Sequence, residues 1–177
     1  MNIAAMVGVA TGIGIGLIIC VAWFIFANTN RKVKTEYDER QQAIRNVGYK
    51  YAFYTVLFYE VIMMILAIGR VELPIAPYAQ HFTGIILGCI VLGLYCVIKD
   101  VYWGLNNNRK RYLVVFAFTI VLNLIPIIMP AMNGTLFEDG QIGMPALNIM
   151  VIIMLAILGV ALLVKQIQEG SKKDEED

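Results

Sequence analysis

The sequence has 177 residues, of which 59% are hydrophobic and 15% charged, and its net charge is +1. A soluble domain of this size is nearer half apolar and a quarter charged, so the excess apolar surface has to face lipid. The balance of acids and bases excludes the strongly basic surface of a nucleic-acid-binding protein. Composition therefore predicts a membrane protein whose main partner is the lipid bilayer.

Five stretches of the sequence are apolar enough to cross a bilayer as a helix, which takes about 20 residues. They are residues 4–27, 51–69, 82–98, 112–131 and 145–164. The first stretch lacks the basic n-region of a signal peptide and is too long for one, so we interpret it as a retained span. The pattern predicts an all-α integral membrane protein, a single bundle of about five transmembrane helices within residues 1–165.

The basic residues predict the orientation of these spans. All Lys and Arg residues except Arg70 fall on alternate connections, which are residues 28–50, residues 99–111 and the tail from Lys165 onward. Positively charged connections stay in the cytoplasm. We therefore expect the N-terminus outside and the C-terminus in the cytoplasm.

The first connection is long and contains a predicted amphipathic helix over residues 35–50. Thr35 followed by Asp38 resembles a capping box, which marks the start of a helix. We expect this helix to lie at the inner membrane surface and to run into the second span. The alternative is a solvated, charged linker. The tail, residues 166–177, carries mixed charges and is predicted to be disordered.

One motif in this connection resembles a known group of proteins. The run is Thr35-Glu36-Tyr37-Asp38-Glu39-Arg40-Gln41, followed by Ile44, Tyr49 and Tyr51. It is similar to the small multi-span membrane proteins of Gram-positive bacteria that carry an Asp-Glu-Arg-Gln motif before a span. That family has no settled activity, so the resemblance implies a bacterial plasma membrane and no particular reaction.

Glu60 is the candidate functional residue, because it falls near the middle of the second span. An ionised side chain at that depth costs roughly 3 kcal/mol. Residue counting places Asn123 of the fourth span at a similar depth, beside carbonyl groups that Pro126 and Pro130 leave without donors. One interpretation is a proton or cation site between the second and fourth helices. The other, which we prefer, is a neutral Glu60 that donates a hydrogen bond to Asn123 or a tyrosine and holds the bundle together.

Small residues recur every four positions along two of the spans. In the first span they are Ala4, Gly8, Gly12, Gly16 and Cys20, and in the third Gly84 and Gly88. This spacing lets helix backbones approach closely. We expect these positions to form a glycine face, which packs either within one chain or between copies.

The residues that usually carry catalysis or bind metals are sparse. His81 is the only histidine, so no two-histidine metal site or conventional triad is available. The three cysteines lie in apolar runs without metal-ligand spacing, and we interpret them as small buried residues. The sequence predicts no metal, no cofactor and no enzyme activity.

Two classes of function remain. In the first, the protein is an accessory or interaction subunit that associates through helix packing with itself or with another membrane protein. In the second, it is a small transporter or channel built around Glu60. The first is preferred, because the sequence lacks the several mid-membrane polar residues and the visible inverted repeats of many transporters.

Overall fold

The computed structural model describes residues 37–104, 109–138 and 140–174, together with Thr11, Gly14, Ile15, Ile18, Val21 and Ala22. Residues Met1–Glu36 and Tyr37–Asp177 form two compact units. The described residues of the first unit are helical. Its predicted packing positions, Ala4, Gly8, Gly12 and Gly16, lie outside the described residues. All the named helices and strands belong to the second unit.

The second unit consists of helices and one short hairpin. In chain order they are α2 (Glu39–Ile68), α3 (Pro77–Ile98), α4 (Arg109–Met132), β1 (Phe137–Glu138), β2 (Gln141–Ile142) and α5 (Pro145–Asp174). These helices correspond to the second to fifth predicted spans, but most extend further. α3 starts five residues before its predicted span, with Pro77 in the first turn, where its missing N–H costs nothing. The tail predicted to be disordered is helical as far as Asp174, because its Gln, Glu and Lys residues are good helix formers.

α2 begins at a different capping box from the predicted one. The N-cap is Asp38, whose Oδ1 accepts a hydrogen bond from the Gln41 backbone N–H at 2.6 Å. The Asp38 N–H in turn donates to Gln41 Oε1 at 3.3 Å. Thr35, at which the box was predicted, lies outside the described residues, and Gln rather than Asp is the usual partner at the later position. The Asp-Glu-Arg-Gln motif is itself the helix start.

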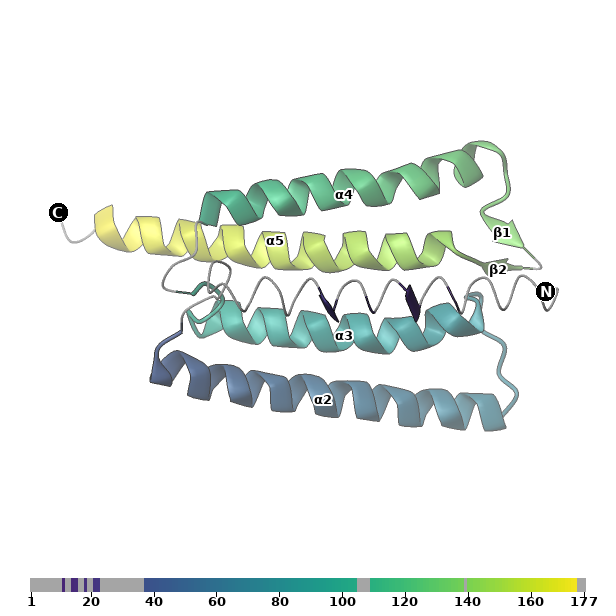
Figure 1. The fold of residues 1–177 in the computed structure, drawn as a ribbon, viewed down its shortest axis with the longest axis horizontal. Coiled ribbons are helices and arrows are strands. Elements are labelled where there is room, and N and C mark those ends of the chain that lie inside the picture. Colours follow the sequence, from purple (N-terminus) through teal and green to yellow (C-terminus); the bar gives the residue numbers. More distant parts are fainter. Residues whose placement is uncertain are drawn as a thin grey trace. The chain divides into compact units, whose positions relative to one another are not determined.

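The predicted surface helix and the second span form one continuous helix. α2 runs from Glu39 to Ile68 without a break, and its two halves share one axis (Figure 1). A helix lying in the plane of the membrane surface would have to bend before entering the bilayer. The first half of α2 instead extends the spanning helix lengthwise.

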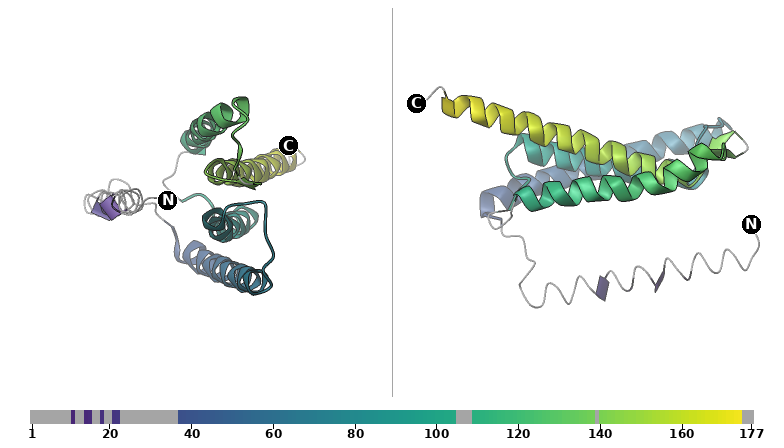
Figure 2. Two further views of the ribbon diagram at one scale, coloured as in Figure 1. Left: turned by 90° about the vertical axis from the view of Figure 1, so that its right-hand side faces the viewer. Right: turned by 90° about the horizontal axis from the view of Figure 1, so that it is seen from above.

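α3 lies at the centre of the second unit. α2 packs on one side of α3, α5 packs on the other side, and α4 packs on α5. Figures 1 and 2 show the resulting order of the helices, α2–α3–α5–α4. All the buried apolar residues except Met63 of α2 lie on or next to α3 and α5. The buried apolar residues are Met63, Ala76, Ala79, Ile86, Cys96, Val97, Val101, Ala146, Leu155 and Leu158.

Glycines on α3 let both neighbouring helices come close. A Cβ added at Gly84 would lie 2.7 Å from a tyrosine ring of α2, and one added at Gly88 would lie 2.7 Å from Val56 Cγ2. On the other side of α3, a Cβ at Gly93 would lie 2.5 Å from a leucine of α5. Gly84 and Gly88, predicted as packing positions, thus contact α2 within the chain, and Gly93 contacts α5.

α2, α3 and α4 end in the same backbone motif. A left-handed residue follows each helix cap, at Arg70 (φ 54°), Asp100 (φ 58°) and Gly134 (φ 68°). The next amide then reaches back into the last turn, as the Val101 N–H does to the Cys96 carbonyl at 2.9 Å. These Schellman motifs provide donors for carbonyls that have no partner inside the helix.

Backbone hydrogen bonds join the connection before α3 to the hairpin. β1 and β2 pair antiparallel, with Phe137 opposite Ile142. The Ile142 N–H also donates to the Pro74 carbonyl at 3.0 Å, and the Ala76 N–H donates to the Ile142 carbonyl at 3.1 Å. The α2–α3 connection is therefore tied to the α4–α5 connection, a link that the sequence did not indicate.

The two ends of the second unit differ in charge. The hairpin, the end of α2 and the start of α3 lie together at what we call the hairpin end (Figure 1). The opposite half, called the basic end, holds the start of α2, the end of α3 and the start of α4. Among the described residues, every Lys and Arg except Arg70 lies in that half or on the end of α5 beyond it.

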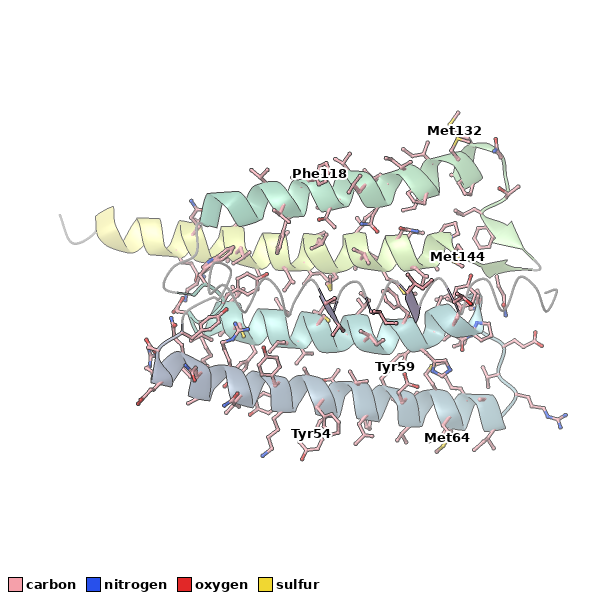
Figure 3. The ribbon with its side chains drawn as sticks, viewed as in Figure 1. Tyr54, Tyr59, Met64, Phe118, Met132 and Met144 are labelled. Atoms are coloured by element: carbon pink, nitrogen blue, oxygen red, sulfur yellow. The ribbon has the colours of Figure 1, made fainter. Side chains whose placement is uncertain are left out.

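All four helices of the second unit are long and apolar enough to cross a membrane. Large apolar side chains cover their outer surfaces, including those of Met64, Phe118 and Met132 (Figure 3). In the apolar window of α4, within Val114–Met132, no residue is buried by the rest of the described structure. The second unit is therefore an all-helical bundle with four helices able to span a bilayer.

Gly88→Ala tests the close contact between α2 and α3. The added methyl would lie 2.7 Å from Val56 Cγ2 and 3.4 Å from the Ala52 carbonyl oxygen. The Val56 side chain or the helices would have to shift, at a cost of about 1–3 kcal/mol, and the better helix propensity of alanine offsets about 1 kcal/mol of that cost. Thermal unfolding in detergent should therefore show a lower midpoint than that of the wild type.

Gly159→Ala on α5 is the matched control. A Cβ at Gly159 meets nothing within 4 Å, and alanine favours a helix over glycine by about 1 kcal/mol. Its unfolding midpoint should be unchanged or higher. Equal midpoints for the two variants would show that Gly88 is not needed for packing.

Candidate functional site

Glu60 of α2 and His81 of α3 form a titratable pair. Glu60 Oε2 lies 2.8 Å from His81 Nδ1, and the two side chains are 37% and 67% exposed, respectively. The sequence analysis expected Glu60 to bond with Asn123 or a tyrosine. Its partner in the structure is His81 instead.

The pair is positioned by the close contact between α2 and α3. Tyr59, which precedes Glu60, donates its hydroxyl proton to the Gln80 carbonyl at 2.8 Å. A Cβ on Gly84 would lie 3.0 Å from Glu60 Oε1, closer than an ordinary contact, so the glycine leaves room for the carboxyl group. Tyr59 and Glu60, which are adjacent on α2, thus contact Gln80 and His81, which are adjacent on α3. Gly84 lies beside both contacts.

The pair lies towards the hairpin end rather than at the middle of the helices. About 12 Å of helix separates Glu60 from the end of α2, and about 6 Å separates His81 from the start of α3. The predicted spans hid this pairing, because the apolar stretch assigned to α3 began after His81. The polar residues at the start of α3, which include His81, are part of the helix. The His81 side chain contacts Glu60.

Asn123 does not meet Glu60. Its side-chain amide donates to the Thr119 carbonyl of its own helix at 2.8 Å. α4 packs on α5, whereas Glu60 is on α2 at the other side of the unit (Figure 1). Residue counting compares positions along each span, but it contains no information on which helices are neighbours.

Arg45 forms a second polar cluster, at the basic end, that sequence reasoning missed. Its Nη1 donates to the Val101 carbonyl at 3.2 Å, and its Nη2 donates to the Tyr49 hydroxyl at 3.2 Å. The guanidinium carbon also lies 4.3 Å from the centre of the Tyr37 ring. Arginine stacks on aromatic faces in this way. The signal in the sequence was the pair of tyrosines at helical spacing around one arginine.

Arg45 holds the start of α2 against the Schellman turn that ends α3. Val101 is fully buried and Cys96, whose Sγ lies 3.9 Å from Arg45 Nη1, is 1% exposed. Close by, the rings of Tyr51 and Tyr95 meet edge to face with centroids 5.4 Å apart. The cluster therefore fixes the α2–α3 pair at the end opposite Glu60.

A shallow apolar groove lies between these two polar clusters. Its volume is about 600 Å³, and its lining comes from α2 and α3. The lining residues are Tyr51, Tyr54, Thr55, Phe58, Tyr59, Ile62, Leu87 and Val91. The Thr55 hydroxyl is already bonded to the Tyr51 carbonyl at 2.9 Å. The groove suits an apolar side chain or lipid chain better than a polar ligand.

The other candidate groups form no larger site. Within the part of the chain that the structure describes, no three His, Cys, Asp or Glu side chains are grouped to hold a metal ion. Cys89, predicted to be buried, is exposed, because it shares with Ile85 a face of α3 that neither α2 nor α5 covers. The chain matches no protein-family profile, no curated protein and no solved structure.

Arg45→Gln tests the cluster at the basic end. The shorter amide cannot span from Tyr49 to Val101, so a buried carbonyl loses its charged donor. Such a loss costs about 1–3 kcal/mol. The unfolding midpoint in detergent should fall clearly below that of the wild type.

Arg40→Gln removes the same charge from an exposed position of α2. Surface substitutions of this kind change stability by about 0.5 kcal/mol or less. If Arg45→Gln proves as mild as Arg40→Gln, the cluster does not stabilise the α2–α3 pair.

Proposed function

We propose that the protein is a multi-pass plasma-membrane protein with five spans, an outside N-terminus and a cytoplasmic C-terminus. The support is the separation of charge, since Arg70 alone among the described basic residues lies at the hairpin end. Under the positive-inside rule the basic end faces the cytoplasm. The resemblance at Asp38–Gln41 supports a bacterial membrane.

We propose further that it acts as an accessory or interaction subunit through helix packing. The observation that supports this interaction role is the exposure of α4. No residue in its apolar window is buried within the described fold. Its outward side chains Phe118, Leu122, Ile125 and Met129 recur at alternating spacings of four and three and are 48–65% exposed. That spacing is the one by which a second helix packs along the first in a left-handed pair.

The alternative is a small transporter or channel with a proton or cation site at Glu60. The Glu60–His81 pair favours it, because it places two polar side chains in contact between two helices able to span a membrane. Against it, no ionisable side chain occurs in Val114–Met132 of α4 or Pro145–Val164 of α5. A relay from the pair to the basic end would therefore have to run along the α2–α3 groove, whose lining is largely apolar.

Single cysteines test the orientation, in a background without the three native cysteines. Cysteines replacing Asn2 and Glu72 should react with an impermeant thiol reagent on intact cells. A cysteine replacing Lys99 should react only after permeabilisation. Glu72 and Lys99 are both exposed and lie in opposite connections of α3, so the reverse pattern would exclude the proposed orientation.

Photo-crosslinking in native membranes tests the interaction role. A benzophenone amino acid replaces Phe118 on α4, and the matched control replaces Phe53 on α2, which is similarly exposed. We expect Phe118 to yield a discrete adduct with a second protein chain, either another copy or a different membrane protein.

Lipid adducts alone at both positions would contradict the interaction role. A proton flux into liposomes containing the purified protein, abolished by Glu60→Gln, would favour the alternative instead.

A further inference from the structure

We propose that the groove between α2 and α3 is a lipid site, which binds an acyl chain of an anionic phospholipid and holds the lipid phosphate beside Lys50. The groove has a volume of about 600 Å³, and its lining is mostly apolar and aromatic. Both helices that line it are long and apolar enough to cross a membrane. The inference requires that these two helices lie in the bilayer, but it does not depend on the interaction role proposed for α4.

The length of the groove fits one leaflet of a bilayer. Its lining on α2 extends from Tyr51 to Ile62, and a helix rises about 16 Å over that distance. The hydrocarbon core of a bilayer is about 30 Å thick, so the acyl chains of one leaflet cover about 15 Å of it. A phospholipid whose headgroup lies at the basic end would therefore extend its acyl chain along the whole groove.

The side chains of the groove favour a lipid chain over a second helix as the occupant. Helices pack closely in membranes where small residues let the two backbones approach. The lining here is instead rich in large rings, those of Tyr51, Tyr54, Phe58 and Tyr59. These rings keep a second backbone at a distance, whereas a flexible acyl chain can lie between them. The Thr55 hydroxyl, already bonded to its own helix, needs no polar partner from the occupant.

Lys50 provides charge complementarity at the basic end of the groove. It lies one helical turn before the lining residue Tyr54, so the two side chains are neighbours on the surface of α2. Lys50 is exposed and forms no ion pair with any described acidic residue. No acidic residue occurs on α2 between Glu39 and Glu60 to neutralise its charge. A lysine near the end of a span extends its ammonium group towards the headgroups, where it can contact a lipid phosphate.

Photo-crosslinking with two lipids in vesicles tests the site. The full chain is reconstituted in phosphatidylcholine vesicles that contain a small fraction of phospholipid with a diazirine in its acyl chain. The labelled lipid is either phosphatidylglycerol or phosphatidylcholine, and mass spectrometry locates the adducts. We expect phosphatidylglycerol to label residues 51–62 and 87–91 about five times more than phosphatidylcholine, because one lysine near a membrane surface favours anionic lipid by about that factor. Equal labelling of these segments by the two lipids would overturn the proposal.

Two lysine variants separate a local site from a general attraction of anionic lipid to the basic end. Lys50→Gln should remove the preference for phosphatidylglycerol in the groove segments. Lys99→Gln is the matched control, because Lys99 is also exposed at the basic end, but the residue one turn before it, Tyr95, does not line the groove. It should keep the preference. An equal effect of the two variants would contradict a site at Lys50.

A second pair of variants tests whether the acyl chain occupies the groove itself. Val91→Phe places a ring in the groove and should reduce the labelling of residues 51–62. Val114→Phe makes the same change on α4, where Val114 is exposed and does not line the groove, and should leave that labelling unchanged. Unreduced labelling in Val91→Phe would overturn the proposal.

A benzophenone amino acid in place of Leu87 identifies the occupant in native membranes. Leu87 lines the groove on α3, so we expect lipid adducts at this position. An adduct with a protein chain would show that a helix occupies the groove, and the lipid site would then be wrong.

Discussion

The close approach of α2 to α3 is the constraint on which the other contacts depend. Gly84 and Gly88 remove the side chains that would keep the two backbones apart. At this separation polar side chains bridge the helices, as those of Glu60 and Tyr59 do to His81 and Gln80. Each of those contacts is 2.8 Å long, so a shift of one methyl group would break both.

Lipid explains why such contacts are needed. Apolar surface gains little by leaving lipid for another helix, so packing and hydrogen bonds have to hold membrane helices together. In the same solvent, an unpaired backbone group costs several kcal/mol. The capping box at Asp38, the Schellman ends of three helices and the pairing of β2 with residues 74–76 all supply partners for such groups.

The sequence predicted the helices well and their neighbours poorly. Apolar run length is a property of each segment alone, so the spans that correspond to α2 to α5 could be located, although α2 begins at Glu39 rather than 51 and α5 continues to Asp174 rather than 164. The order α2–α3–α5–α4 depends on which side chains fit together, and neither hydropathy nor residue counting contains that information. Glu60 was found because a carboxyl group in a span is unusual, but its partner was assigned to Asn123, on a helix that does not adjoin α2.

Arg45 illustrates a different limit. The positive-inside rule already explains basic residues near a span. The sequence therefore gives no separate reason to expect a specific contact for Arg45. Its role depends on the turn at residues 99–101, which lies more than 50 positions away in the sequence. The Schellman motif that aims the Val101 carbonyl at Arg45 has Asp100 at its left-handed position, where glycine would have been the recognisable signal.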